Sequence, residues 1–143
     1  VICTGNSLAL AEDPVTISQA LSAMAQSVSP SGALVLHIVN IHSRPEGPVQ
    51  WDKALRVKLS RGEHLLHKGI HRCGGRGYVD FVLTSLNTFE VVTRSVPFAG
   101  LKQSWLSEQL RQCGLTHIEV FGGYGRQGFD ESGSGDLIVV AVR

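Results

Sequence analysis

Ala33-Leu34-Val35-Leu36-His37-Ile38-Val39 is the stretch of sequence that decides the fold. Apart from His37 it is an unbroken apolar run, and such runs are typical of strands buried on both faces of a parallel sheet. On a strand of this kind we expect His37 to be a core histidine whose hydrogen bonds are satisfied inside the protein.

The segments before this strand predict a strand–turn–helix–strand order. Val1-Ile2-Cys3 is an apolar strand, and Thr4-Gly5-Asn6-Ser7 is the turn that ends it. Asp13-Pro14 is a helix start, because Asp accepts from free backbone N–H groups and Pro loses nothing at the first helical position. Apolar residues then recur at helical spacing as far as Pro30-Ser31-Gly32: Ile17, Leu21, Met24 and Val28. This order predicts α/β architecture.

The middle of the chain predicts antiparallel strands. Turn signals separate three candidate strands, at Glu63–Arg72, Tyr78–Leu86 and Phe89–Val96, and Pro97 is expected to stop the last of them. Leu55–Leu59 alternates apolar and basic residues and is a candidate edge strand. Because the connections are short, we expect an antiparallel β-meander over residues 55–98.

The last part of the chain predicts one helix and two strands. Apolar residues at helical spacing run from Leu101 to Cys113, and Gly114 suits the left-handed cap that ends a helix. Ile118–Phe121 and Leu137–Val142 are the two strands, and the glycine-rich segment Gly122–Gly135 joins them.

Composition narrows the class of protein. A length of 143 residues favours one domain, and 43% hydrophobic residues are enough to build a core. Thirteen basic against twelve acidic residues leave a net charge of +1, which argues against a dedicated binder of nucleic acid or of anionic membranes. The three cysteines are widely spaced and odd in number, so we expect reduced thiols and a cytoplasmic protein.

Several segments together resemble one family. Val1–Leu8 resembles the fourth-strand segment of class I S-adenosylmethionine-dependent methyltransferases, in particular the glycine/sarcosine N-methyltransferase-like group, where an apolar strand ends in Cys-x-Gly-Asn-Ser-Leu or Phe. Ser29–His37, Leu101–Gly114 and Phe121–Ala141 follow in the family's order, and Asn40 stands where that group has an Asn at a strand end. The match is best over residues 1–43 and 100–143.

The resemblance implies a partial domain. The family's glycine-rich cofactor loop and its ribose-binding acidic residue would precede Val1, so the chain corresponds to the C-terminal half of a Rossmann-like methyltransferase. Its sheet would supply the contiguous strands 4-5-7-6, from residues 1–43 and 100–143, and residues 55–98 would be an inserted meander, all within one partial domain. The strand near Val1 would lose a neighbour, and we expect a homodimer through that exposed edge.

The resemblance also implies site residues. The turn after the first strand would contact the methionine part of S-adenosylmethionine, through Thr4, Gly5, Asn6, Ser7 and Leu8; the alternative is an ordinary Asn-Ser turn. Asn40 would bind the substrate, and His42 is a weak candidate for the group that accepts a proton from it. Turn residues of the meander are further candidate substrate contacts, or else simply solvated: Arg72, Arg76 and Tyr78.

Three patterns are set aside. The glycine-methylating enzymes have an Arg just before the strand-end Asn, and Val39 stands there in this chain, so glycine itself is not expected as the substrate. His64, His67 and His71 together suggest a metal site, but on a strand His64 and His67 would point to opposite faces, so no metal site is predicted. Gly123–Gly128 matches Gly-x-Gly-x-x-Gly, but no helix follows it, and we do not expect it to bind a dinucleotide.

The prediction for function is therefore part of a methyltransferase that acts on a small-molecule nucleophile with S-adenosylmethionine. The fragment by itself is expected to be inactive and not to bind the cofactor tightly. The alternative from another class of protein is a non-catalytic α/β module for interaction or dimerisation.

Overall fold

The computed structural model describes residues 1–11 and 13–143 and divides into two compact units. Unit 1 consists of Val1–Arg44 and Ala99–Arg143, and unit 2 of Pro45–Phe98. The second unit therefore begins ten residues before the meander predicted over residues 55–98.

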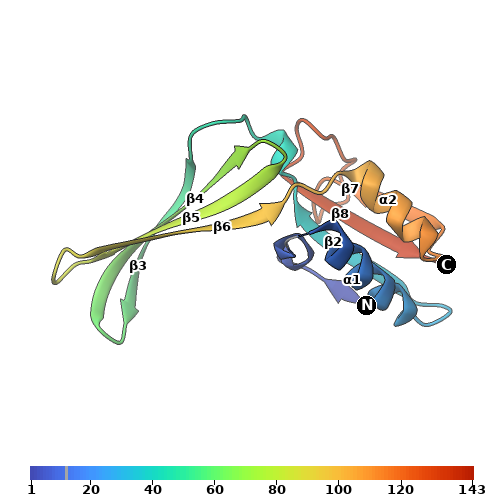
Figure 1. Ribbon diagram of the computed structural model, residues 1–143, viewed down its shortest axis with the longest axis horizontal. Helices are drawn as coiled ribbons and strands as arrows, with labels where there is room; N and C mark the ends of the chain where they lie inside the picture. Colours follow the sequence, from blue (N-terminus) through green and yellow to red (C-terminus); the bar gives the residue numbers. More distant parts are fainter. Residues whose placement is uncertain (12) are drawn as a thin grey trace. The chain divides into compact units, whose positions relative to one another are not determined.

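The four strands of unit 1 form one mixed sheet in the order β1-β2-β8-β7 (Figure 1). β1 (Ile2–Cys3) is parallel to β2 (Ala33–Val39), and β8 (Asp136–Val142) runs antiparallel to both β2 and β7 (His117–Phe121). This is the predicted order 4-5-7-6, with β2 between the opening strand and the last strand. The sequence-based prediction of the fold class is confirmed.

Burial on β2 alternates, which corrects the expectation that both of its faces are deeply buried. Leu34, Leu36 and Ile38 are fully buried, whereas the residues between them are only half-buried. The covered face is the one that α1 (Pro14–Gln26) and α2 (Gln103–Gln112) pack against. The two helices lie side by side on it (Figure 1), and the Ser18 hydroxyl donates to Gln109 Oε1 at 2.7 Å.

Both helices begin and end close to their predicted limits. Asp13 caps α1, because its carboxylate accepts from the Thr16 hydroxyl at 2.7 Å and from the Thr16 amide at 2.9 Å, and these bonds hold the pKa of Asp13 below its usual value. Two short 3-10 helices were not predicted: η1 (Ser7–Leu10) and η2 (Ile41–Ser43). Among the described residues, no helix has both the length and the apolar character needed to cross a membrane.

Unit 2 is a meander of four strands in chain order. They are β3 (Gln50–Leu59), β4 (Gly62–Cys73), β5 (Arg76–Ser85) and β6 (Val91–Ala99), and the β3–β4 and β4–β5 pairs are antiparallel. The strand predicted at Phe89–Val96 is wrong at both ends. Phe89 lies in the preceding turn with φ of 60°, and Pro97 does not stop the strand, since β6 is an edge strand that can do without one N–H.

One close approach ties β5 to the end of β6. A Cβ placed on Gly77 would lie 2.1 Å from the ring of Phe98, which is itself buried. Only glycine leaves room for this ring, so the Gly77–Phe98 contact fixes the end of the sheet at which the chain leaves unit 2.

Candidate functional site

The turn after β1 is held in a left-handed conformation at the carboxyl end of β2. Gly5 and Asn6 have φ of 70° and 67°, and nothing would lie within 4 Å of a Cβ on Gly5, so the backbone conformation is what favours glycine there. The Asn6 amide donates to the His37 carbonyl at 3.3 Å, and Asn6 Oδ1 accepts from the Val39 amide at 3.0 Å. The Asn6 side chain therefore joins the turn to β2 by a hydrogen bond.

His37 completes this turn. The Gly5 amide donates to His37 Nδ1 at 3.3 Å, and His37 Nε2 lies 3.1 Å from Asp136 Oδ1. An amide N–H can only donate, so Nδ1 accepts, and the neutral ring carries its proton on Nε2 and donates it to Asp136. Tyr124 lies against the ring, with 5.3 Å between ring centroids. His37 is thus bonded within the protein, as predicted, but it is half-buried rather than part of the core, and its partners in the turn and in β8 were not foreseen.

Exposure divides the five predicted cofactor residues. Thr4, Gly5 and Ser7 are exposed, whereas Asn6 and Leu8 are buried. Only the exposed members have atoms at the surface that a ligand could reach, and the buried Asn6 bonds the turn to β2.

The Asn40 side chain is buried and bonded within the protein. Its Nδ2 donates to the carbonyls of Glu131 at 2.9 Å and Ser134 at 2.7 Å, and its Oδ1 accepts from the His42 amide at 3.2 Å. It is 2% exposed. Asn40 therefore fastens the loop before β8 to the end of β2, and its role in binding substrate stays a prediction.

Two further groups shape this loop and its surroundings. His42 Nε2 donates to the Gly100 carbonyl at 3.1 Å, so in the neutral ring only Nδ1 has a lone pair. The Asp130 carboxylate accepts from the amide and hydroxyl of Ser132, and these bonds hold the pKa of Asp130 below its usual value.

In unit 2 the predicted substrate residues are split between the two faces of the sheet. Tyr78 pairs with His71 across β4 and β5, and their rings stack at 4.8 Å with 7° between the planes. Arg76 alternates onto the same face as Tyr78, whereas Arg72, one residue after His71, falls on the other. The register therefore brings Tyr78 and Arg76 together and separates them from Arg72, whose Nε donates to the Gly74 carbonyl at 3.3 Å.

A second histidine–aspartate pair lies beside Tyr78. His71 Nδ1 is 2.5 Å from Asp80 Oδ2, and the two side chains are 23% and 16% exposed. Sequence analysis considered His71 only as a metal ligand and did not consider Asp80. The available signal was the spacing Tyr78-x-Asp80 on one face of a strand that follows His71 through a short turn. No group of three or more His, Cys, Asp or Glu in the described chain is placed to hold a metal ion.

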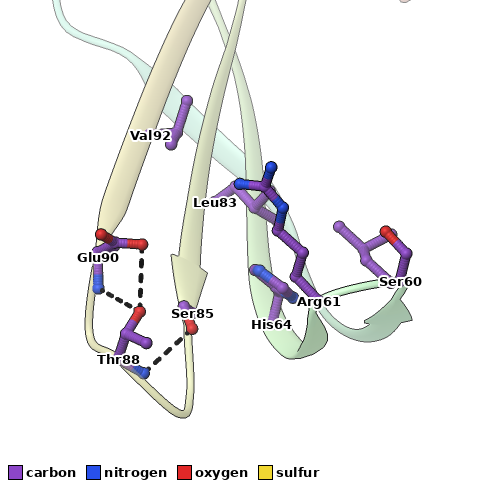
Figure 2. Close-up of a pocket in the computed structure, with 9 residues that line it drawn as sticks. Ser60, Arg61, His64, Leu83, Ser85, Thr88, Glu90 and Val92 are labelled. Carbon is purple, nitrogen blue, oxygen red and sulfur yellow. Dashed lines mark hydrogen bonds between the residues drawn. The ribbon is translucent and has the colours of Figure 1, made fainter.

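Among the cavities lined by described residues, two open on unit 2. One, of about 280 Å³, is lined in part by Trp51, Asp80 and Arg94. The other, of about 300 Å³, lies at the opposite end of the sheet between two hairpin turns (Figure 2). There Thr88 bonds to Ser85 and Glu90, and His64 lies near Arg61 in the same view. None of the site residues predicted from sequence lines either cavity.

Solved structures of methyltransferases share this fold. The CcbJ methyltransferase from Streptomyces caelestis superposes with a TM-score of 0.70 at 15% identity, over 99% of this chain and 55% of that one. A sugar N-methyltransferase from a Streptoalloteichus species gives 0.71 at 18%, over 100% and 55%. An amino pentose methyltransferase from Micromonospora echinaspora, solved with S-adenosylmethionine bound, gives 0.65 at 16%, over 98% and 56%.

The chain has the fold of part of an S-adenosylmethionine-dependent methyltransferase. It spans little more than half the length of the methyltransferases it matches. No family model and no curated protein matches the sequence.

The turn of this methyltransferase fold has the atoms to receive a positively charged ligand. The amides of Gly5, Asn6 and Ser7 all donate within the protein. Among the hydrogen bonds of residues 1–11 and 13–143, none ends on the Gly5 carbonyl. The turn therefore offers the Gly5 carbonyl as a hydrogen-bond acceptor rather than an N–H donor, and an acceptor of this kind suits a ligand's ammonium group.

Proposed function

We propose that this chain is part of an S-adenosylmethionine-dependent methyltransferase that acts on a small-molecule nucleophile. One observation carries the proposal: a left-handed Gly5–Asn6 turn is locked by Asn6 and His37 at the carboxyl ends of neighbouring parallel strands. In open α/β sheets, ligands bind outside the carboxyl ends of the strands. The methionine part of the cofactor would contact Thr4, Gly5 and Ser7 in this turn.

Such a reaction asks for placement more than for covalent help from the protein. The cofactor, when bound, supplies a methyl group already activated on a sulfonium. What this chain contributes is a rigid turn that holds the ligand, since alignment of the reacting atoms removes most of the entropic cost. The bonds of Asn6 and His37 prepare that rigidity before any ligand arrives.

For the methyl acceptor we propose contacts in both units. In unit 1 they are Asn40 and, as a weak candidate for proton transfer, His42. In unit 2 they are Arg72, Arg76 and Tyr78. The solved relatives described as a sugar N-methyltransferase and an amino pentose methyltransferase favour an acceptor that carries an amine. Val39 is apolar and half-buried, which supports an acceptor other than glycine within the glycine/sarcosine-like group.

Calorimetry with S-adenosylhomocysteine tests the cofactor part of the proposal. We expect residues 1–143 alone to show no tight binding, and the complete gene product that contains them to bind at micromolar concentration or better. Asn6→Ala in that product should weaken binding, because the Val39 amide loses its partner and the turn loosens. Sub-micromolar binding by residues 1–143 alone would contradict the proposal that the chain is an incomplete binding domain.

The second candidate function is pairing between copies of the chain, and the β1 edge favours it. β1 is an edge strand in the unit 1 sheet, and Ile2 on it is 74% exposed. Unpaired apolar edges associate readily. Light scattering of residues 1–143 should then show a dimer that Ile2→Lys dissociates, and a monomer at high concentration would argue against it.

A further inference from the structure

The cavity of about 300 Å³ on unit 2 is bounded by two hairpin turns that contact each other. Gly62 ends the turn between β3 and β4, and a Cβ placed on it would lie 2.5 Å from the side-chain nitrogen of Asn87, which belongs to the turn between β5 and β6. Gly62 also has φ of 112°, a conformation that glycine adopts without strain. The contact fixes the two turns against each other, so the cavity exists before any ligand arrives.

His64 lines this cavity and presents a lone pair to it. It is 9% exposed, and its Nδ1 lies 3.0 Å from the Gly62 carbonyl. A carbonyl can only accept, so in the neutral ring Nδ1 carries the proton and Nε2 holds the lone pair. Nε2 has no hydrogen-bond partner among the described residues, and no side-chain nitrogen sealed from solvent in them lacks one. Nε2 is therefore reached by solvent, on the side where His64 meets the cavity.

Ser85 presents the complementary group. It lies directly opposite His64 across β4 and β5, so both side chains are on one face of the sheet, where the Cβ atoms of such pairs are about 5 Å apart. Ser85 is 7% exposed, and its Oγ accepts from the Thr88 amide at 3.2 Å. Its hydroxyl proton is donated to no acceptor in the part of the chain that the structure describes. A free lone pair and a free hydroxyl proton thus lie side by side in the cavity.

A hydroxyl group of a ligand matches these two buried residues. Its oxygen can accept from Ser85 Oγ–H, and its own proton can be donated to His64 Nε2. A carboxylate has no proton for Nε2, and an ammonium has no lone pair for the Ser85 hydroxyl. A neutral hydroxyl therefore serves both residues with one atom, and buried polar groups favour such complete pairing.

The charged side chains at the rim also favour a neutral ligand. Arg61 and Glu90 line the same cavity, and Figure 2 shows them on opposite sides of it. The Arg61 side chain has no hydrogen bond or ion pair with residues 1–11 or 13–143, and Glu90 accepts from the Thr88 hydroxyl at 3.3 Å. An anion drawn to Arg61 would meet the Glu90 carboxylate, and a cation would meet the reverse. Further hydroxyls can accept from the guanidinium and donate to the carboxylate without this conflict.

The rest of the lining suits the carbon skeleton of a small ring. Leu59, Leu83 and Val92 come from three different strands and give the cavity apolar walls. Leu59 and Val92 are 46% and 49% exposed, so a ligand would remove apolar surface from water. A volume of about 300 Å³ is at the lower end of the range for small-molecule sites.

From these observations we infer that this cavity of unit 2 binds a neutral polyhydroxylated molecule, such as a sugar ring, with one hydroxyl held between Ser85 and His64. The ring would lie against the apolar walls, and its other hydroxyls would bond to Arg61 and Glu90 at the rim. Every residue of this site belongs to unit 2, and the site is independent of the function proposed above.

Nitrogen-15 and carbon-13 spectra of residues 1–143 test the site, with glucose, galactose and mannose as probes. At least one of them should bind saturably with a Kd of about 1 mM, as expected for a few hydrogen bonds to a small ligand. The largest changes should be at His64 Nε2, Ser85 and the Leu83 methyl groups. No saturable change with any of the three sugars, or changes confined to other residues, would overturn the inference.

Three further probes test the chemistry of the ligand. Tetrahydropyran has the same kind of ring without hydroxyls, glucuronate carries a negative charge, and glucosamine carries a positive charge. Each should bind at least about fivefold more weakly than the best neutral sugar, because each loses hydrogen bonds or meets a like charge at the rim. Equal or tighter binding of any of the three would overturn the assignment to a neutral polyhydroxylated ligand.

Variants then locate the bound hydroxyl. Ser85→Ala removes the donor and His64→Phe removes the acceptor, so each should weaken sugar binding about fivefold, the effect of one hydrogen bond. Thr84→Ala and His67→Gln are the matched controls on the same two strands, since Thr84 and His67 lie on the other face of the sheet. They should leave the affinity unchanged.

Amide spectra show whether each variant keeps the fold. If His64→Phe does not fold, the comparison of Ser85→Ala with Thr84→Ala decides. Wild-type affinity in Ser85→Ala, or an equal loss in the matched control, would overturn the inference.

Discussion

Among the described residues, unit 1 holds the bonded pair His37–Asp136 and unit 2 the bonded pair His71–Asp80, and the two pairs are bonded in opposite senses. In unit 1, His37 Nε2–H donates a hydrogen bond to Asp136, and Nδ1 accepts one from the Gly5 amide. In unit 2, His71 Nδ1–H donates a hydrogen bond to Asp80, which leaves the lone pair on Nε2. The same two residue types therefore serve different ends: the first pair positions the backbone of the turn, and the second joins side chains of neighbouring strands.

The backbone around each pair explains the difference. His37 stands at the carboxyl end of a strand whose parallel neighbour ends in a left-handed turn, and this turn brings a backbone N–H against the ring. His71 stands in an antiparallel pair, where the backbone groups bond to each other and only side chains reach the ring.

Substituting each of the two aspartates by asparagine should separate the two pairs most strongly. In residues 1–143, Asp80→Asn should change the nitrogen-15 signals of the His71 ring, because Nδ1 loses the carboxylate that accepts from it. Asp136→Asn should change the signals of the His37 ring and leave those of His71 as they are. Nitrogen-15 spectra of the two variants measure both effects, and equal changes at both rings in each variant would remove the distinction between the pairs.

Filling the contact at Gly77 should weaken unit 2 selectively. Gly77→Ala places a methyl group where the Phe98 ring lies, so we expect a loss of about 1–3 kcal/mol in the free energy of unfolding of that unit. Hydrogen exchange of residues 1–143 should show faster exchange across β5 and β6. Gly75→Ala is the control, since no atom lies within 4 Å of its Cβ position. Equal effects of the two substitutions would show that the packing contact is unimportant.

Two amide substitutions of His37 should sharpen the positioning role. Asn at this position keeps an acceptor near the place of Nδ1, whereas Gln keeps a donor near the place of Nε2 and leaves the Gly5 amide without its partner. Loss of one such bond costs about 1 kcal/mol, so His37→Gln should weaken cofactor binding about fivefold and His37→Asn less. Exchange of the Gly5 amide in residues 1–143 gives the same comparison without a ligand.

The smallest expected effect is on the stability of unit 1 at acidic pH. The bonds from Thr16 lower the pKa of Asp13 in the folded protein, so Asp13 stabilises unit 1 above the usual aspartate pKa, and this contribution is lost as the pH falls through the lowered value. Asp13→Ala should therefore reduce the stability of unit 1 slightly at pH 7, with the gap to wild type closing at strongly acidic pH. Urea unfolding at several pH values measures it, and a gap independent of pH would contradict the assignment.

Local signals in the sequence predicted the parts of the fold that depend on local physics. The cap at Asp13, the helix end near Gly114 and the apolar run of β2 each indicate their structures directly. The alternating burial of β2 was not predicted, because coverage of a strand is set by helices that pack on it from elsewhere in the chain. Pro97 was taken as a stop because its place at the sheet edge cannot be known before the sheet is assembled.

The candidate site was predictable to a similar extent. The turn at residues 4–8 has a recognisable sequence, but the link from Gly5 to His37 joins residues 32 positions apart. The pair of His71 and Asp80 depends on the register of β4 and β5, which places them diagonally across two strands. This register, rather than residue type, makes Asp80 the hydrogen-bond partner of His71.

The most direct test of the account is a crystal structure of the complete gene product with S-adenosylhomocysteine. We predict the methionine part of the ligand against the turn at residues 4–8, with its ammonium within hydrogen-bond distance of the Gly5 carbonyl. A ligand seated away from this turn, or no binding by the complete protein, would contradict the central claim.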